Sequence, residues 1–171
     1  MIPTARLHLR PVEPRDAEAL HRHWMQPEVR RYLWDGEIIP LLHVENLVEQ
    51  STGQFVREGH GLWAMRLRED EVTGLIGCGG FWRFHEPPTL ELVLSLDPAW
   101  WRQGLAQEAG CALIAYGFDH LSFDAVWGST DAPNAASIRL MERLGMRFFH
   151  RAEADGLDTV SYRVTASEWV H

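Results

Sequence analysis

Cysteines and long apolar runs are scarce in this sequence. Its two cysteines, Cys78 and Cys111, lie far apart in apolar surroundings, which fits neither a disulfide framework nor the close pairing of a zinc site. No stretch approaches the ~18 apolar residues of a membrane-spanning helix. Residues 1–20 carry charged side chains and lack the apolar run of a signal peptide, so we expect a cytoplasmic protein that does not insert into membranes. The nine histidines do not cluster, so no metal site is expected.

Basic residues are also fewer than acidic residues. The formal net charge of −8 argues against nonspecific binding to nucleic acid, because such binding requires lysine and arginine to neutralise phosphates. The same charge favours the approach of a cationic partner. Hydrophobic residues make up 46% of the sequence and charged residues 23%, as is typical of globular proteins. The 171 residues fit a single domain, 1–171, which would bury roughly two thirds of its unfolded surface.

The apolar residues follow two periodicities along the chain. Seven segments alternate or are rich in β-branched and aromatic residues, as strands are: 4–11, 61–68, 72–84, 90–96, 123–130, 146–150 and 159–164. Four segments repeat apolar residues at helical spacing: 17–24, which stops near Pro27, then 41–56, 104–118 and 134–144. Asn134 suits the N-cap of the last helix and Gly145 its C′ position. This mixed order predicts an α+β fold, an α/β sandwich with helices packed on a sheet.

The segment 99–109 predicts a sharp turn from a strand into a helix. It follows the strand 90–96 and Pro98, and a long helix opens directly after Gly104. Such a turn leaves backbone N–H groups unpaired at the positive end of a helix dipole, where a phosphate group is stabilised. Gly77-Cys-Gly-Gly80 is a poorer candidate, because a strand-like run follows it and no helix begins there. We therefore expect an anion to bind at the turn of residues 101–106.

Short motifs occur in a defined order and spacing over nearly the whole chain. They are Arg6-Leu-His-Leu-Arg-Pro11, Gly74-Leu-Ile-Gly77, Glu91-Leu-Val-Leu-Ser-Leu-Asp-Pro98, Trp101-Arg-Gln-Gly-Leu-Ala-Gln-Glu-Ala109, Asn134-Ala-Ala-Ser137, Leu144-Gly145 and Glu168-Trp169. Together they resemble the GNAT superfamily of acyl-CoA-dependent N-acyltransferases. The resemblance is to its RimJ/RimL-like branch of ribosomal-protein N-terminal acetyltransferases, in which tryptophan is usual at the position of Trp101.

The resemblance implies a GNAT fold with acetyl-CoA as cosubstrate and no metal. The fold has a mixed central sheet of about six to seven strands, splayed between the fourth and fifth strands and flanked by about four helices. The backbone N–H groups that would hold the CoA pyrophosphate are those of Arg102, Gln103, Gly104, Leu105 and Ala106. The open strand would pair with the pantetheine amides at Leu94, Ser95 and Leu96.

The start of the helix 134–144 would make further contacts with CoA. The resemblance assigns Asn134 to CoA or to the neighbouring backbone, and Ser137 faces the same side one turn later. Arg139 and Arg143, four residues apart, are candidates for the adenosine 3′-phosphate. The alternatives are a helix cap for Asn134 and a solvated face for at least one of the two arginines.

An amine nucleophile must lose a proton before or during attack, so a base is required. The resemblance favours Glu91 as that base or as a substrate-binding group, and a glutamate that faces water at the strand start is the alternative. His85 and Glu86 are further candidates. The Leu94 N–H would stabilise the charge that develops on the thioester oxygen. Many members use a tyrosine as the acid where this chain has Met141, which cannot donate a proton. Ser137, a water or no acid at all would then serve the leaving thiolate.

These features predict an acetyl-CoA-dependent N-acetyltransferase in which a primary amine attacks directly in a ternary complex, without an acyl-enzyme. The acceptor is a protein N-terminus, a polyamine or another small amine, and the chain is a monomer or a homodimer. The alternative is a catalytically weak acyl-CoA-binding module, which Met141 supports. Four tryptophans could line an acceptor pocket, but core packing is the favoured interpretation for all except Trp34: Trp24, Trp34, Trp63 and Trp82.

Overall fold

The computed structural model describes residues 1–70, 72–84, 89–154 and 156–169. One sheet holds eight strands in the order β1-β2-β3-β4-β5-β6-β8-β7. The strands are β1 (Ile2–Pro3), β2 (Leu7–Pro11), β3 (Leu62–Leu67), β4 (Gly77–Phe84), β5 (Thr89–Leu96), β6 (Ala125–Asp131), β7 (Arg147–Ala154) and β8 (Leu157–Thr165). The helices are α1 (Ala17–Trp24), α2 (Pro27–Leu33), α3 (Leu41–Glu58), α4 (Leu105–Leu121) and α5 (Ala135–Arg143).

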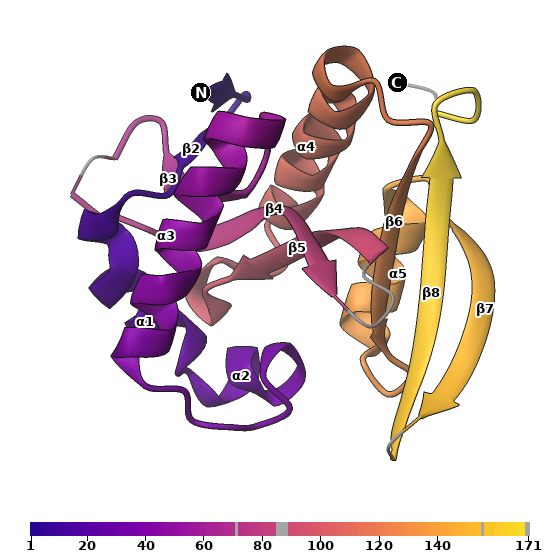
Figure 1. Cartoon of the computed structure of the whole chain (residues 1–171), viewed down its shortest axis with the longest axis horizontal. Helices are drawn as coiled ribbons and strands as arrows, with labels where there is room; N and C mark the ends of the chain where they lie inside the picture. Colours follow the sequence, from indigo (N-terminus) through magenta and orange to yellow (C-terminus); the bar gives the residue numbers. More distant parts are fainter. Residues whose placement is uncertain (71, 85–88, 155, 170–171) are drawn as a thin grey trace.

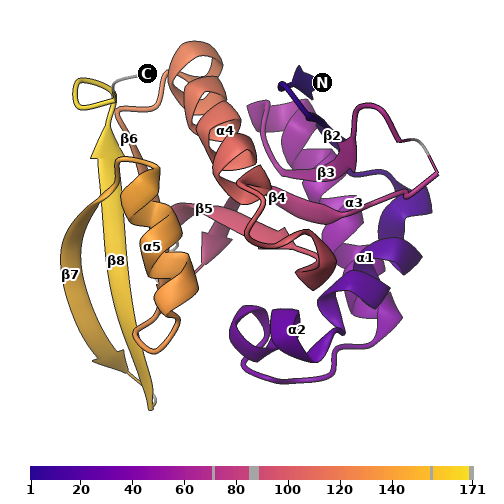
Figure 2. The same ribbon diagram turned by 180° about the vertical axis from the view of Figure 1, so that it is seen from behind.

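Helices cover both faces of the sheet. Figures 1 and 2 show α1, α2 and α3 on one face and α4 and α5 on the other. Each face has its own buried cluster. Leu20 and Val44 belong to the cluster under α1 and α3, whereas Leu113 of α4 and Met141 of α5 belong to the cluster on the opposite face. The sheet is therefore the middle layer of an α/β sandwich.

The strands change direction at the centre of the sheet. Strands β1 to β5 are antiparallel neighbours, β5 and β6 are parallel, and β6, β8 and β7 are antiparallel again. β4 and β5 are in register from the pair Gly77–Leu96 onward. Within the described residues, by contrast, β5 and β6 pair only at Glu91 and Trp127. The two strands therefore diverge beyond Glu91, and no strand of the described part of the chain pairs with the second half of β5 on that edge.

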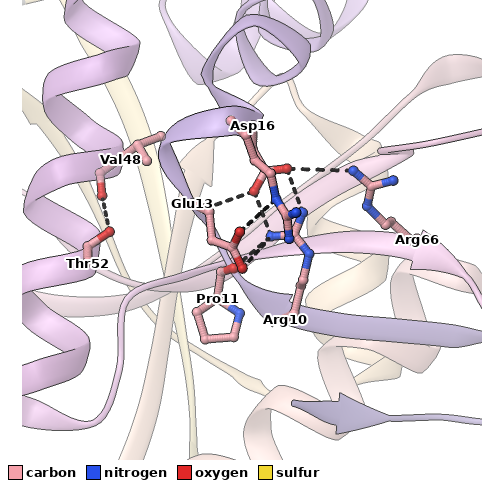
Figure 3. Close-up of polar contacts among 8 residues, drawn as sticks. Arg10, Pro11, Glu13, Asp16, Val48, Thr52 and Arg66 are labelled. Atoms are coloured by element: carbon pink, nitrogen blue, oxygen red, sulfur yellow. Dashed lines mark hydrogen bonds and ion pairs between the residues drawn. The ribbon is translucent and has the colours of Figure 1, made fainter.

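A buried ion pair holds the start of α1 against β2. Asp16 is 1% exposed, and it accepts hydrogen bonds at 2.7 Å from both terminal nitrogens of Arg10 and at 2.8 Å from the Glu13 N–H. Figure 3 shows Arg66 of β3 approaching the same carboxylate, at 3.6 Å. Burial raises the pKa of Asp16, but the hydrogen bonds outweigh burial and hold that pKa below its usual value. This pair fixes the turn that directs α1 across the sheet.

The predicted α+β sandwich is confirmed, with eight strands and five helices where fewer were expected. The added strand, β1, has only two residues, too few for a periodic pattern. The added helix, α2, begins at Pro27, where we expected a helix to end, because proline is tolerated at the first helical position. The strand predicted for 72–84 begins only at Gly77, because Asp70 accepts from the N–H groups of Val72 and Thr73 and closes a turn there.

Candidate functional site

The second half of β5 presents a row of backbone groups to the gap between β5 and β6. In antiparallel strands, residues alternate between those whose peptide groups face the partner strand and those whose peptide groups face away. The Asp97 N–H donates to the Ile76 C=O at 2.8 Å, in register with the β4–β5 pairs. The alternation therefore turns the peptide groups of Leu94 and Leu96 toward the gap between β5 and β6, while those of Ser95 face β4. A ligand with amide groups could pair with this edge as a further strand would.

The end of β5 leads into a tight turn that contains two left-handed residues. Arg102 has a φ of 61° and Gly104 a φ of 78°. Gly104 is the N-cap of α4 and has no side chain to cap it, so the N–H groups of the first helical turn remain as donors. Trp101 Nε1 donates to the Leu96 C=O at 2.6 Å and ties the turn to the strand. Because glycine leaves room beside the backbone, this turn can approach a phosphate closely.

An ion pair between Arg6, near the beginning of the chain, and Glu108 of α4 stabilises the turn. Arg6 Nη1 donates to the Gln103 C=O at 2.8 Å, and Arg6 Nε donates to Glu108, in the first turn of α4, at 2.7 Å. Thr4 Oγ1 donates to the same carboxylate at 2.5 Å. Burial raises the pKa of Glu108, but the bonds from Thr4 and Arg6 outweigh it and hold that pKa below its usual value. Sequence reasoning missed this brace, although Arg6 opens the first motif.

Glu91 lies at the vertex of the splay, where β5 leaves β6. It is paired with Trp82 of β4 and with Trp127 of β6, and it is 6% exposed. The Ser129 hydroxyl of β6 donates to its carboxylate. The alternative expectation of a glutamate that faces water is therefore wrong. A buried carboxylate at this point can accept a proton from a group held in the gap between the strands.

An apolar cavity of about 250 Å³ lies beside β5, under α1, α2 and α3. Three of the four tryptophans considered from the sequence line it: Trp24, Trp34 and Trp82. Trp24 packs in the core as well, and Trp63 is a core residue, at 1% exposed, as expected. Trp82 packs against the cluster under α1 and α3, as expected, and also contributes to the cavity wall.

Ser95 anchors a hydrogen-bonded group in the wall of this cavity. Its Oγ lies 3.0 Å from His23 Nε2 and accepts from Trp24 Nε1 at 3.2 Å. His23 is buried, and burial lowers its pKa to about 4 against the opposing influence of the nearby Asp97 charge. The imidazole is therefore neutral near pH 7, and the Ser95 side chain is held on the cavity face of β5.

Asn134 caps α5 as one of its two predicted roles requires. Its Oδ1 accepts from the Ser137 N–H at 3.2 Å, and its Nδ2 donates to Thr130 Oγ1 at 3.0 Å. Ser137 is half-buried in the first turn, whereas Arg139 is exposed. Met141 is buried in the cluster between α4, α5 and the sheet. At this position the side chain contributes packing and offers no proton.

His85 and Glu86 lie outside the described residues. Among the residues that are described, no group of three or more His, Cys, Asp and Glu side chains could hold a metal ion. In the same part of the chain, no helix has the length and apolar character needed to cross a membrane. Burial raises the pKa of the Cys78 and Cys111 thiols, which disfavours the reactive thiolate at both.

Comparisons with known proteins identify the family of this chain and show the fold that it shares with solved structures. Residues 6–147 match the family model described as an acetyltransferase (GNAT) domain. The uncharacterized N-acetyltransferase YnaD of Bacillus subtilis (strain 168) is 26% identical over 178 residues, which cover 98% of each chain. The crystal structure of a GNAT-family acetyltransferase from Bacillus anthracis has a TM-score of 0.79 at 23% identity, covering 96% of this chain and 97% of that one.

A third similar protein has a stated target. It is the acetyl transferase from Salmonella typhimurium that modifies the N-terminal serine of the 50S ribosomal subunit protein L7/L12. Its structure has a TM-score of 0.80 at 16% identity and covers 96% of this chain and 98% of that one. The low identity shows a shared fold only, whereas the family model spans most of the sequence. This chain therefore belongs to the GNAT acetyltransferase family, whose members use acetyl-CoA, and it is an N-acetyltransferase.

Proposed function

We propose that this enzyme transfers the acetyl group of acetyl-CoA to a primary amine by direct attack in a ternary complex. The observation that carries the proposal is the position of Glu91, a buried side chain at the vertex of the splay in contact with the Ser129 hydroxyl. At that vertex an amine would lie beside a base, and a thioester would lie beside the open edge of β5. Such positioning lowers the barrier of a two-substrate reaction.

The donor side of the proposed site follows the backbone. The turn from Arg102 through Gln103, Gly104 and Leu105 to Ala106 would hold the pyrophosphate with its N–H groups. The Leu94 C=O and the Leu96 N–H would pair with the pantetheine amides. Ser95 would keep the strand in place through its hydroxyl. Asn134, Ser137 and Arg139 of α5 are proposed as further contacts with CoA.

The transfer step uses groups at the vertex. The Glu91 carboxylate takes a proton from the acceptor ammonium group, directly or through a water, and the free amine then attacks the thioester carbonyl. The Leu94 N–H donates to the carbonyl oxygen as negative charge develops there. The intermediate collapses with loss of the CoA thiolate, which is a tolerable leaving group near neutral pH. The nitrogen gives up its second proton as the amide forms, and Ser137 or a water passes a proton to the thiolate, because Met141 has none to give.

Direct attack requires that no side chain of the enzyme carries the acetyl group. Cys78 is buried and Cys111 is half-buried, and burial disfavours the thiolate form of both.

Protein N-termini, polyamines and other small amines are the acceptor classes compatible with the net charge of −8, since all are cationic. The stated target of the Salmonella protein supports the first of these classes.

A catalytically weak acyl-CoA-binding module is the second candidate, and the buried Met141 supports it. A single-turnover experiment with acetyl-labelled acetyl-CoA and a panel of amines separates the two. We expect release of free CoA and label on an amine, and no label on the protein when amines are left out. Label retained on the protein would contradict direct attack. Thermal stabilisation by acetyl-CoA without CoA release for any amine would favour the module.

A further inference from the structure

The cavity beside Glu91 is walled by rings and aliphatic side chains. Trp24 and Trp34 meet edge to face with their ring centroids 5.5 Å apart, and Trp34 meets His43 in the same way, also at 5.5 Å. Leu47 of α3 and Val93 of β5 add aliphatic walls. No Asp, Glu, Arg or Lys among the described residues lines the cavity. A charged group placed inside would lose its hydration without gaining a counter-ion, which is costly.

Carboxyl groups lie just outside the cavity. Glu91 shares a face of β5 with Val93 and precedes it by about 7 Å along the strand, because alternate residues of a strand point the same way. On β6, burial raises the pKa of Asp131, and the nearby charge of Asp35 raises it further. Asp35 directly follows Trp34 in the cavity wall. An ammonium group would therefore be stabilised beside the cavity, and an uncharged group would be stabilised within it.

The volume of the cavity sets the size of its occupant. It measures about 250 Å³. A cavity of ~150 Å³ lined by Leu, Ile and Phe is large enough to bind benzene. There is thus room for one aromatic ring and a short alkyl linker, and aromatic walls favour a ring because edge-to-face contacts add to the gain from burial. A polyamine would instead place a second ammonium group in the apolar space.

We propose that the acceptor is a small primary amine that carries one uncharged aromatic ring on a short alkyl linker. Its amino group lies at Glu91, and its ring enters the cavity between Trp24, Trp34 and Trp82. This inference rests on the proposed function, since it names the acceptor class of the same site. It disfavours polyamines and peptides whose first side chain is small and polar.

The first test compares acceptors on the unaltered enzyme by release of free CoA. The acceptors are 2-phenylethylamine, ethylamine, spermidine and a peptide with an N-terminal serine. Burial of a ring of this size favours binding by about tenfold or more, so we expect kcat/KM for 2-phenylethylamine to exceed that of each other acceptor by at least about tenfold. An equal or higher kcat/KM for ethylamine or spermidine would overturn the inference. The highest value for the peptide would overturn it in favour of a protein N-terminus.

The second test fills the cavity. Leu47→Trp adds bulk to its α3 wall, whereas Leu42→Trp adds the same bulk at a position of α3 that is 64% exposed. We expect Leu47→Trp to lower the ratio of kcat/KM for 2-phenylethylamine to that for ethylamine by about tenfold or more. Leu42→Trp should leave this ratio unchanged. An unchanged ratio in a folded Leu47→Trp variant would overturn the inference.

The outcomes separate this inference from the proposed function. Release of CoA with several amines, without preference for the ring, contradicts the acceptor class and leaves direct acetyl transfer standing. Absence of CoA release with every amine contradicts the proposed function itself. If Leu47→Trp does not fold, which thermal unfolding will show, the comparison of acceptors on the unaltered enzyme decides alone.

Discussion

Substitution of Gly104 by alanine is expected to weaken acetyl-CoA binding more than it weakens the fold. Gly104 has a φ of 78°, where an L-residue costs about 1–2 kcal/mol. Alanine recovers about 0.4–1 kcal/mol because it reduces the entropy of the unfolded chain. The net loss of about 1 kcal/mol should lower Tm by about 2–4 °C for a chain of this length.

The larger effect should fall on the ligand. The added Cβ would lie 3.4 Å from Arg6 Nη2, so the fold can accommodate it, but it occupies the apex of the proposed pyrophosphate-binding turn. A phosphate held away from one backbone N–H loses a charge-assisted hydrogen bond, which contributes about 1.5–3 kcal/mol. We therefore expect Kd for acetyl-CoA to rise about tenfold or more, as measured by titration calorimetry at a temperature where the variant is folded.

Gly145→Ala is the matched control for this experiment. Gly145 has a φ of 75°, and no atom lies within 4 Å of the position where its Cβ would be. Its N–H donates to the Glu142 C=O, and the Met146 N–H donates to the Met141 C=O, both at 3.0 Å, so that it closes α5 in a Schellman motif. The control should lose similar stability without a change in Kd. An unchanged Kd in Gly104→Ala, or an equal rise in both variants, would refute the reasoning.

Two further predictions concern stability. Asp16→Asn should lower the free energy of unfolding in urea by about 3 kcal/mol, because it removes the nearest counter-ion of the largely buried Arg10 and leaves it the more distant Glu13 carboxylate, at 3.7 Å, and an unchanged midpoint would contradict this. The pKa of His23 falls from 6.5 to about 4 on folding, so the unfolded chain binds that proton first and stability decreases as the pH falls from 6.5 toward 4, by about 3 kcal/mol. His23→Gln should lack this part of the pH dependence, and parallel profiles for the two proteins would refute it.

The helices and strands could be predicted where the spacing of the apolar residues reflects which side chains are buried. The segments 41–56 and 104–118 carry apolar residues at helical spacing, and the structure has α3 and α4 there, each somewhat longer at its carboxyl end. The ends were missed because the last turn of each helix is more polar. β1 and α2 could not be predicted, since two residues have no period and Pro27 is compatible with both the end and the start of a helix.

The strand and the turn expected to bind acetyl-CoA are adjacent in sequence, whereas the contacts that brace the turn and those that form the acceptor side join distant residues. Leu94 and Gly104 lie on a strand and the turn that follows it, so their spacing alone suggested a common ligand. The contact of Glu91 with Ser129 joins residues 38 positions apart, and that of Arg6 with Glu108 joins residues 102 positions apart. The cavity combines side chains from three helices and three strands. For this reason the contribution of Trp82 to the cavity wall could not be predicted from its sequence context.

The turnover of Glu91→Gln tests most directly whether Glu91 deprotonates the acceptor. The amide retains an oxygen that can accept from the Ser129 hydroxyl, but it can no longer take a proton from the amine. General-base catalysis contributes about 10²–10⁴-fold, so kcat with saturating acetyl-CoA and amine should fall at least about 100-fold, while Kd for acetyl-CoA stays within about twofold. The difference in kcat between Glu91→Gln and the unaltered enzyme should become smaller at higher pH, where more of the amine is already deprotonated. A kcat within about threefold of the unaltered enzyme would contradict the account.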